Sequence, residues 1–183
     1  MNLNRWQLLK RAEIKFKVIE KWLKSSDQIL DIGCGPGAVA FLLKEHSFHV
    51  GTIDIQHKSA FDSVTPTIFD GLHLPYHDNA FDVCLILTVL HHAKTPLALL
   101  KEAKRVSRGR IIVIEDIYTN SVQLFITKLF DSIVNSEFSG HPHNNKKFEH
   151  WIDIFQSLDL DVTESRQRRF LGFFRQADFL LET

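Results

Sequence analysis

Three glycines alternate at positions 33, 35 and 37, directly after an apolar run that contains the carboxylate Asp31. Glycine leaves no side chain, so a ligand can lie directly against the backbone of such a loop. A tight turn without a ligand gains little from three alternate glycines, because each one costs backbone entropy without adding packing. We therefore interpret residues 33–37 as a ligand-binding loop between a strand and a helix. Pro36 fits the start of that helix.

The class of ligand depends on charge. Gly33, Gly35 and Ala38 also satisfy the dinucleotide fingerprint G-x-G-x-x-G/A, and Asp54 lies where a ribose-binding acid is expected. An NAD-dependent oxidoreductase is therefore one alternative. However, an anionic diphosphate gains nothing from Asp31 beside its loop, whereas an ammonium or sulfonium group does. The pattern favours a nucleoside with cationic character, and S-adenosylmethionine (SAM) fits this description.

Two further acids end the next two apolar runs. Asp54 closes the second run, at the strand end where ligands bind in open α/β sheets, and a carboxylate there can accept both hydroxyls of a ribose. A helix N-cap is its structural alternative. Asp70 ends the third run and can accept the exocyclic amine of adenine, while the backbone of Gly71 and Leu72 can meet a ring nitrogen. Together the acids predict one nucleoside site.

Four histidines are candidates for acid–base chemistry. His91 and His92 follow the fourth apolar run, and His141 and His143 lie in a polar segment, residues 136–147. Histidine titrates near neutral pH and can deprotonate a hydroxyl or thiol acceptor. Alternatively, His91 and His92 anchor a loop, and His141 and His143 belong to a polar surface loop. No Cys/His spacing resembles a zinc site, so we predict no metal.

The bulk composition bounds the class of protein. With 183 residues, 44% apolar and 24% charged, the chain predicts one domain over residues 1–183. Lys plus Arg equals Asp plus Glu at 22 each, which argues against broad nucleic-acid binding. Cys34 and Cys84 lie in apolar contexts and are expected to be reduced thiols. With no apolar signal region and no run near 18 residues, we expect a cytoplasmic protein.

The elements alternate so that the acids meet at one edge. Strands are predicted at residues 28–32, 49–53, 66–69, 81–87 and 110–115, with helices at 38–46 and 96–106 and a shorter one at 57–63. Repeated strand–helix–strand units imply a parallel sheet with helices on both faces. Helices at 121–134 and 147–158 follow. Strands at 161–166 and 170–181 then pair as an antiparallel hairpin at the sheet edge.

Both ends of the chain are rich in basic residues. Residues 3–23 predict an amphipathic helix whose other face is basic: Lys10, Arg11, Lys15, Lys17, Lys21 and Lys24. We interpret that face as a solvated flank, with a membrane or RNA contact as alternatives. Arginines and phenylalanines also interleave over residues 166–175. They either bind single-stranded nucleic acid or place phenylalanines in the core and arginines in water.

Taken together, these motifs resemble the class I SAM-dependent methyltransferases, and most of all the type-11 group that includes quinone-biosynthesis methyltransferases. The resemblance is carried by residues 29–37, Asp54 and residues 70–82, 88–92 and 101–117. It implies a Rossmann-like three-layer α/β sandwich with a seven-stranded, mostly parallel sheet in the order 3-2-1-4-5-7-6 and an antiparallel last strand. Residues 107–110 depart from the group's paired glycines, and we expect them to alter a turn away from the cofactor.

The resemblance also implies a site. Asp31 and residues 33–37 would hold the methionine part of SAM, Asp54 the ribose, and Asp70 with the following backbone the adenine. Leu87 and Thr88 would lie beside the sulfonium and its methyl group. The predicted cofactor contacts are Asp31, Gly33, Cys34, Gly35, Gly37, Asp54, Ile55, Asp70, Gly71, Leu72, Leu87 and Thr88. Direct displacement of the methyl group would leave S-adenosylhomocysteine (SAH) and needs alignment more than acid–base help.

The acceptor would be defined by the N-terminal helix, within residues 1–24, and by a lid at residues 118–150. Neutral charge and an apolar lid favour a small-molecule or lipophilic acceptor over nucleic acid, and leave a peripheral membrane contact open. The loop and the acids indicate binding only. A SAM-binding partner or regulatory protein without catalysis is therefore a second alternative.

Overall fold

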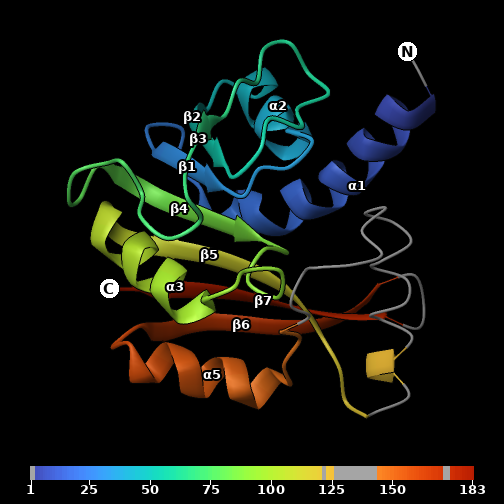
Figure 1. Ribbon diagram of the computed structural model, residues 1–183. Helices are drawn as coiled ribbons and strands as arrows, with labels where there is room; N and C mark the ends of the chain where they lie inside the picture. Colours follow the sequence, from blue (N-terminus) through green and yellow to red (C-terminus); the bar gives the residue numbers. More distant parts are fainter. Residues whose placement is uncertain (1–2, 121–122, 126–143, 171–173) are drawn as a thin grey trace.

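The computed structural model describes residues 3–120, 123–125, 144–170 and 174–183, and its centre is one seven-stranded sheet. The strands are β1 (Gln28–Ile32), β2 (His49–Asp54), β3 (Thr67–Ile68), β4 (Phe81–Leu87), β5 (Ser107–Ile117), β6 (Asp161–Phe170) and β7 (Phe174–Glu182). Their order is β3-β2-β1-β4-β5-β7-β6 (Figure 1). β1 to β5 pair in parallel, and β7 is antiparallel to both β5 and β6. The predicted fold and strand order are confirmed.

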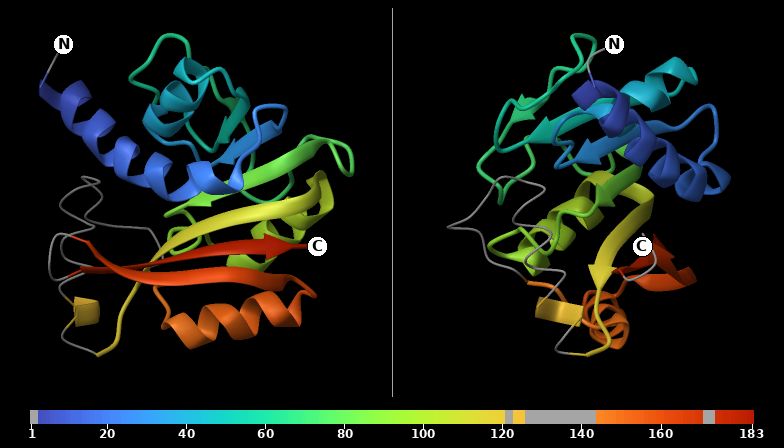
Figure 2. Two further views of the ribbon diagram at one scale, coloured as in Figure 1. Left: turned by 180° about the vertical axis from the view of Figure 1, so that it is seen from behind. Right: turned by 90° about the vertical axis from the view of Figure 1, so that its right-hand side faces the viewer.

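Helices cover both faces of the sheet (Figures 1 and 2). One layer holds α1 (Leu3–Ile19), its 3₁₀ extension η1 (Glu20–Trp22) and α2 (Ala38–Glu45). The other holds α3 (Pro96–Val106) and α5 (Phe148–Ser157). Pro96 occupies the first turn of α3, where its missing N–H is no loss. The result is the predicted three-layer sandwich.

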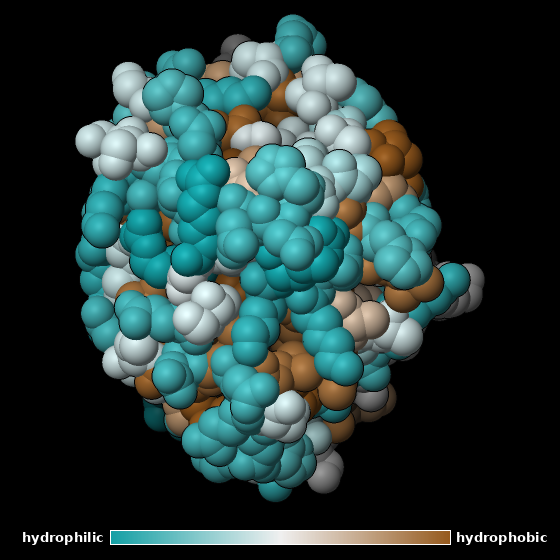
Figure 3. All heavy atoms as spheres, turned by 90° about the vertical axis from the view of Figure 1, so that its left-hand side faces the viewer, coloured by the Kyte–Doolittle hydropathy of each residue, from teal (hydrophilic) through white to brown (hydrophobic). Residues whose placement is uncertain are grey.

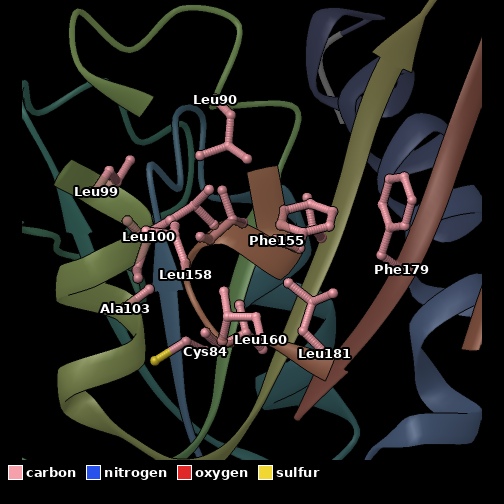
Figure 4. Packing of buried hydrophobic residues seen from close by; sticks show 14 of the residues in the cluster. Cys84, Leu90, Leu99, Leu100, Ala103, Phe155, Leu158, Leu160, Phe179 and Leu181 are labelled. Atoms are coloured by element: carbon pink, nitrogen blue, oxygen red, sulfur yellow. The ribbon is translucent and has the colours of Figure 1, made fainter. Parts of the chain in front are cut away.

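The core beneath α3 and α5 follows helical spacing. Leu99, Leu100 and Ala103 form the buried stripe of α3 and are at most 3% exposed. They meet Phe155 from α5 and Cys84 from β4, and Figure 4 shows these side chains converging. Because β4 and β5 are buried on both faces, their sequences read as nearly continuous apolar runs.

The opposite core fixes α1 on the sheet. Ala12, Phe16 and Ile19 recur at intervals of four and three residues and are all buried. Phe16 and Ile19 pack in one cluster with Leu85 and Leu87 of β4. This packing carries α1 across the sheet towards the carboxyl ends of β1 and β4.

Two local predictions were wrong. Residues 57–63 contain a turn and no helix, because the Ser59 hydroxyl accepts the N–H of Phe61 (3.2 Å) and donates to its carbonyl (3.0 Å). Residues 107–110 do not form a turn, since β5 already starts at Ser107. Arg108 and Arg110 there form ion pairs with acids at the amino ends of the strands, Asp82 (2.9 Å) and Asp27 (2.6 Å).

The predicted helix at residues 121–134 lies outside the described residues, except for 123–125, which are helical. The C-terminal hairpin is confirmed, with β6 forming the sheet edge. In the parts of the chain that the structure describes, no helix is both long and apolar enough to cross a membrane. The face that carries the amino ends of the strands is mainly hydrophilic (Figure 3).

Candidate functional site

The glycine loop follows β1 at the carboxyl edge of the sheet. Gly33, Gly35 and Gly37 all have positive φ, at 71°, 51° and 76°. A Cβ at Gly33 would lie 2.7 Å from the methyl groups of Val89, and one at Gly37 would lie 2.8 Å from Val64, so both positions are filled by packing. A Cβ at Gly35 would have nothing within 4 Å. Gly35 is therefore the loop position that is open to a ligand.

Asp54 closes this loop from β2. One of its oxygens, Oδ2, accepts the N–H of Gly35 at 2.7 Å, and the other, Oδ1, accepts the N–H of Gln56 at 3.2 Å. The Gly33 N–H donates to the carbonyl of Ile53 at 2.8 Å. A carboxylate offers about four lone-pair sites, so Asp54 can still accept ribose hydroxyls. The structure thus brings the predicted ribose acid and the open glycine together.

Asp31 is buried in the α1-side layer, with 3% of its surface exposed. Burial raises the pKa of its carboxyl to about 7; the Lys15 ammonium opposes this rise and the Asp54 carboxylate adds to it. A further positive charge beside Asp31 would favour its ionised form. This is the electrostatic setting that a cationic ligand would find.

Lys15 is a site residue that the sequence did not indicate. Its Nζ donates to the carbonyl of Leu87 at 3.0 Å and to Oγ1 of Thr88 at 2.8 Å. The prediction that Lys15 belongs to a solvated flank is therefore wrong. Ala12 and Ile19, three residues before and four residues after Lys15, are buried. Because residues three and four apart share one face of a helix, this spacing could have placed Lys15 on the buried face. Burial lowers the pKa of Lys15.

The end of β4 has an unusual backbone. Thr88 has a φ of 65°, a left-handed conformation that β-branched residues rarely adopt. Its N–H donates to the Ile114 carbonyl at 2.6 Å, and its hydroxyl donates to the Leu87 carbonyl at 2.5 Å. Such outliers persist where the surroundings over-determine them, and they cluster at functional sites.

The predicted adenine residues lie beyond β3. Asp70 is exposed, and its Oδ1 accepts the N–H groups of Leu72 and His73, both at 2.7 Å. Hydrogen bonds from the backbone and side chain of His73 and from the backbone of Leu72 lower the pKa of Asp70 to about 2. Gly71 has a φ of 84°, and a Cβ there would lie 3.3 Å from the Ile55 side chain. Ile55 and Leu72 are exposed apolar side chains near Gly71, and a flat ring can pack on such side chains.

His91 is enclosed beneath the loop that follows β4. It is 1% exposed, and its Nδ1 lies 2.6 Å from Oε2 of the buried Glu115. Oε1 of Glu115 accepts the N–H groups of Val89 (2.9 Å) and Leu90 (2.7 Å). Asn144 donates its N–H to the His91 carbonyl at 2.8 Å. This placement supports the reading of His91 as a loop anchor.

The other candidate histidines differ in position. The His92 ring lies 4.1 Å from that of His91 and is partly buried. His141 and His143 lie outside the described residues. A catalytic role for any of the four stays a prediction.

Both cysteines are free. Burial raises the pKa of Cys84 to about 12 and also raises that of Cys34, so neither thiol is a ready nucleophile. Among the described residues, no three His, Cys, Asp or Glu side chains are grouped as a metal ion would require.

Comparison with known proteins shows what the central part of the chain resembles. Residues 30–113 match the methyltransferase domain family. Over 104 residues the chain is 33% identical to the 27-O-demethylrifamycin SV methyltransferase of Amycolatopsis mediterranei, covering 49% of this chain and 38% of that protein. It is 25% identical over 183 residues to a ubiquinone/menaquinone biosynthesis C-methyltransferase of Ruegeria sp., covering 86% of this chain and 69% of that one. The central part of this chain is therefore similar to the methyltransferase domain family, and its relatives include two named methyltransferases.

Solved structures agree on the fold. A SAM-dependent methyltransferase of Methanosarcina mazei superposes with a TM-score of 0.72 at 17% identity, covering 91% of this chain and 96% of that one. The magnesium protoporphyrin IX methyltransferase of Synechocystis, solved with bound SAH, gives 0.69 at 15% identity, with 96% and 83% coverage. The chain spans less than half the length of the first curated relatives that it matches.

Proposed function

We propose that this chain transfers a methyl group from SAM to a small-molecule or lipophilic acceptor by direct displacement, leaving SAH. The observation that carries the proposal is the open backbone position at Gly35, held by Asp54 and flanked by the buried Asp31. An uncovered backbone beside two carboxylates fits a ligand that combines hydroxyl donors with a positive charge. The same surroundings are unfavourable for the diphosphate of NAD.

The residues present fit the parts of SAM. Asp31 and the backbone of residues 33–37 would hold its methionine portion, and Asp54 its ribose. Ile55, Gly71 and Leu72 would contact the adenine. Asp70 would share its Oδ2 between the adenine amine and His73, whose Nδ1 lies 3.0 Å away.

SAM supplies a methyl group that its sulfonium has already activated, so the chain has to bind, orient and exclude water. Asp31 supplies negative charge, and the Leu87 carbonyl and the Thr88 hydroxyl place oxygen atoms at the end of β4. Glu115 holds the following loop by three hydrogen bonds, two from the backbone and one from His91. Fixing this loop would keep the acceptor side of the site in one geometry.

A small cavity of about 230 Å³ is a candidate place for part of the acceptor. It lies at the end of β5, and its lining combines the apolar Ile117, Tyr118 and Phe148 with the polar Thr119, Lys147, Glu149 and Gln167. Ile117 is three residues beyond Ile114, whose carbonyl binds Thr88. A mixed lining of this kind suits a small molecule with an apolar body. The named substrates of the two methyltransferase relatives point the same way.

We further propose that residues 1–183 act as one domain, with residues 118–150 as its substrate lid. The continuity of β5, β7 and β6 in one sheet supports this arrangement.

Calorimetry with SAM, SAH and NAD tests the cofactor, and transfer of labelled methyl groups to a panel of small acceptors tests the reaction. We expect SAM and SAH to bind and NAD not to bind. Binding of NAD alone would contradict the proposal. Binding of SAM without transfer to any acceptor, the chain itself included, would instead support a regulatory role.

A further inference from the structure

The Lys15 ammonium lies at the carboxyl end of β4. Its two acceptors, the Leu87 carbonyl and the Thr88 hydroxyl, are the groups expected beside the cofactor's sulfonium. Lys15 reaches them from α1, more than 70 residues away in the sequence. The chain therefore places its own cation where a cationic ligand is to bind.

Charged groups on several elements face Lys15. The acids Asp116 and Glu115 of β5 and Asp31 of β1 stabilise its charged form, and Arg168 of β6 destabilises it. Arg168 is itself held by a pair of 3.0 Å hydrogen bonds to Asp178 of β7. Asp116 accepts a hydrogen bond from Gln176 at 2.8 Å, and burial raises its pKa. Burial opposes the ammonium and lowers the pKa of Lys15, while these acids oppose that effect.

A sulfonium at this position would shift the protonation equilibrium of Lys15 towards the neutral amine. Two like unit charges at neighbouring positions of a partly buried site alter the protonation equilibrium of an amine by roughly a hundredfold. We propose that Lys15 makes the site sensitive to cofactor charge: binding of the sulfonium form releases the Lys15 proton to solvent, whereas binding of the neutral thioether SAH leaves it in place. The inference rests on the proposed function and adds a residue that discriminates between donor and product.

The expected effect is measurable without knowledge of the acceptor. SAM and SAH share adenosine, amine and carboxylate, so their difference isolates the methyl group and its charge. Calorimetric titrations at about pH 7.5, in buffers with different ionisation enthalpies, count the protons released on binding. We expect a larger proton release for SAM than for SAH.

Three variants test the role of Lys15. Lys15→Met loses the Lys15 share of the excess proton release, while Asp31, whose carboxyl a sulfonium also helps to ionise, still contributes. The affinity of this variant for SAM relative to SAH should rise about tenfold, because a competing cation is gone. In Lys15→Arg, whose charge cannot be lost, SAM should bind at least about tenfold more weakly relative to SAH, and only the Asp31 share of the proton release should remain. Lys17→Met, an exposed position on the same helix, should behave as the unaltered chain. SAH binding and thermal melting show that each variant is folded.

The outcomes separate the two proposals. If neither SAM nor SAH binds the unaltered chain, the proposed function fails. If both bind with equal proton release, or if Lys15→Arg keeps the whole difference, the role of Lys15 is overturned while the function stands. Equal weakening of SAM and SAH in Lys15→Met also overturns it, because Lys15 would then hold a group that both ligands share.

Discussion

Replacement of Gly35 separates a ligand-binding loop from a tight turn. Gly35 has a φ of 51°, and a Cβ there has nothing within 4 Å. Gly35→Ala should therefore cost only the left-handed backbone penalty of about 1–2 kcal/mol. For a chain of this size that lowers the Tm by about 2–8 °C. Gly33→Ala adds a clash with Val89 at 2.7 Å, and its total cost should reach about 2–5 kcal/mol.

Binding and stability should respond differently at this position. The added methyl group of Gly35→Ala would enter the space proposed for SAM, and we expect the SAM affinity to fall about tenfold or more, at least 1.4 kcal/mol. Gly35→Asn is the matched variant, because asparagine tolerates the left-handed conformation. Its Tm should stay near that of the unaltered chain while SAM binding is lost.

Calorimetry with SAM and thermal unfolding together measure both quantities. Gly109→Ala is the control, since Gly109 also has nothing within 4 Å but lies at the amino end of β5. If Gly35→Ala and Gly35→Asn bind SAM as tightly as Gly109→Ala does, then Gly35 makes no contact with the ligand. The loop would then be only a turn.

Three further predictions concern the carboxylates. Asp54→Ala removes the acceptor of the Gly35 N–H, so urea unfolding should show a loss of about 1–2 kcal/mol together with weaker SAM binding; unchanged SAM affinity would remove Asp54 from the site. Since folding raises the pKa of Asp31 from 3.8 to about 7, its contribution to stability is complete below about pH 4 and is lost as the pH rises through about 7. Asp31→Asn should flatten the pH dependence of unfolding in that window, and an identical slope in both proteins would refute this. Glu115→Gln replaces a buried acceptor of three hydrogen bonds and should cost about 2–4 kcal/mol, with faster hydrogen exchange at the Leu90 amide. Unchanged exchange there would show that Glu115 does not hold the loop.

The sheet was predictable because its signals are local. Apolar runs predict buried strands, and apolar residues at helical spacing predict the buried face of a helix. The helix α3 has its predicted bounds, Pro96 to Val106, because a proline marks its start. The helix prediction for residues 57–63 was wrong because the Ser59 hydroxyl forms hydrogen bonds with the backbone of Phe61. Propensity over seven residues does not outweigh such a local bond.

The site was predictable in its residues but not in its connections. Asp31 and Asp54 could be predicted as site residues because both lie near strand ends, and the carboxyl ends of parallel strands meet at one edge of the sheet. That Asp54 binds the Gly35 N–H, or that Glu115 anchors the loop at His91, depends on distances between separate elements. Sequence spacing does not contain those distances.

Lys15 alters the charge argument that favoured a cationic ligand. That argument treated Asp31 as a carboxylate awaiting a positive partner, whereas the folded chain already faces it with an ammonium, and burial leaves its pKa near 7. A sulfonium therefore gains binding energy from Asp31 in two cases only. Either it takes over from the Lys15 ammonium as the partner of Asp31, or it causes the Asp31 carboxyl to ionise. The free energy of cofactor binding then includes moving a proton, and it should vary with pH more for SAM than for SAH. Asp31 locates the positive charge of the ligand, but the preference for that charge depends on the residue opposite.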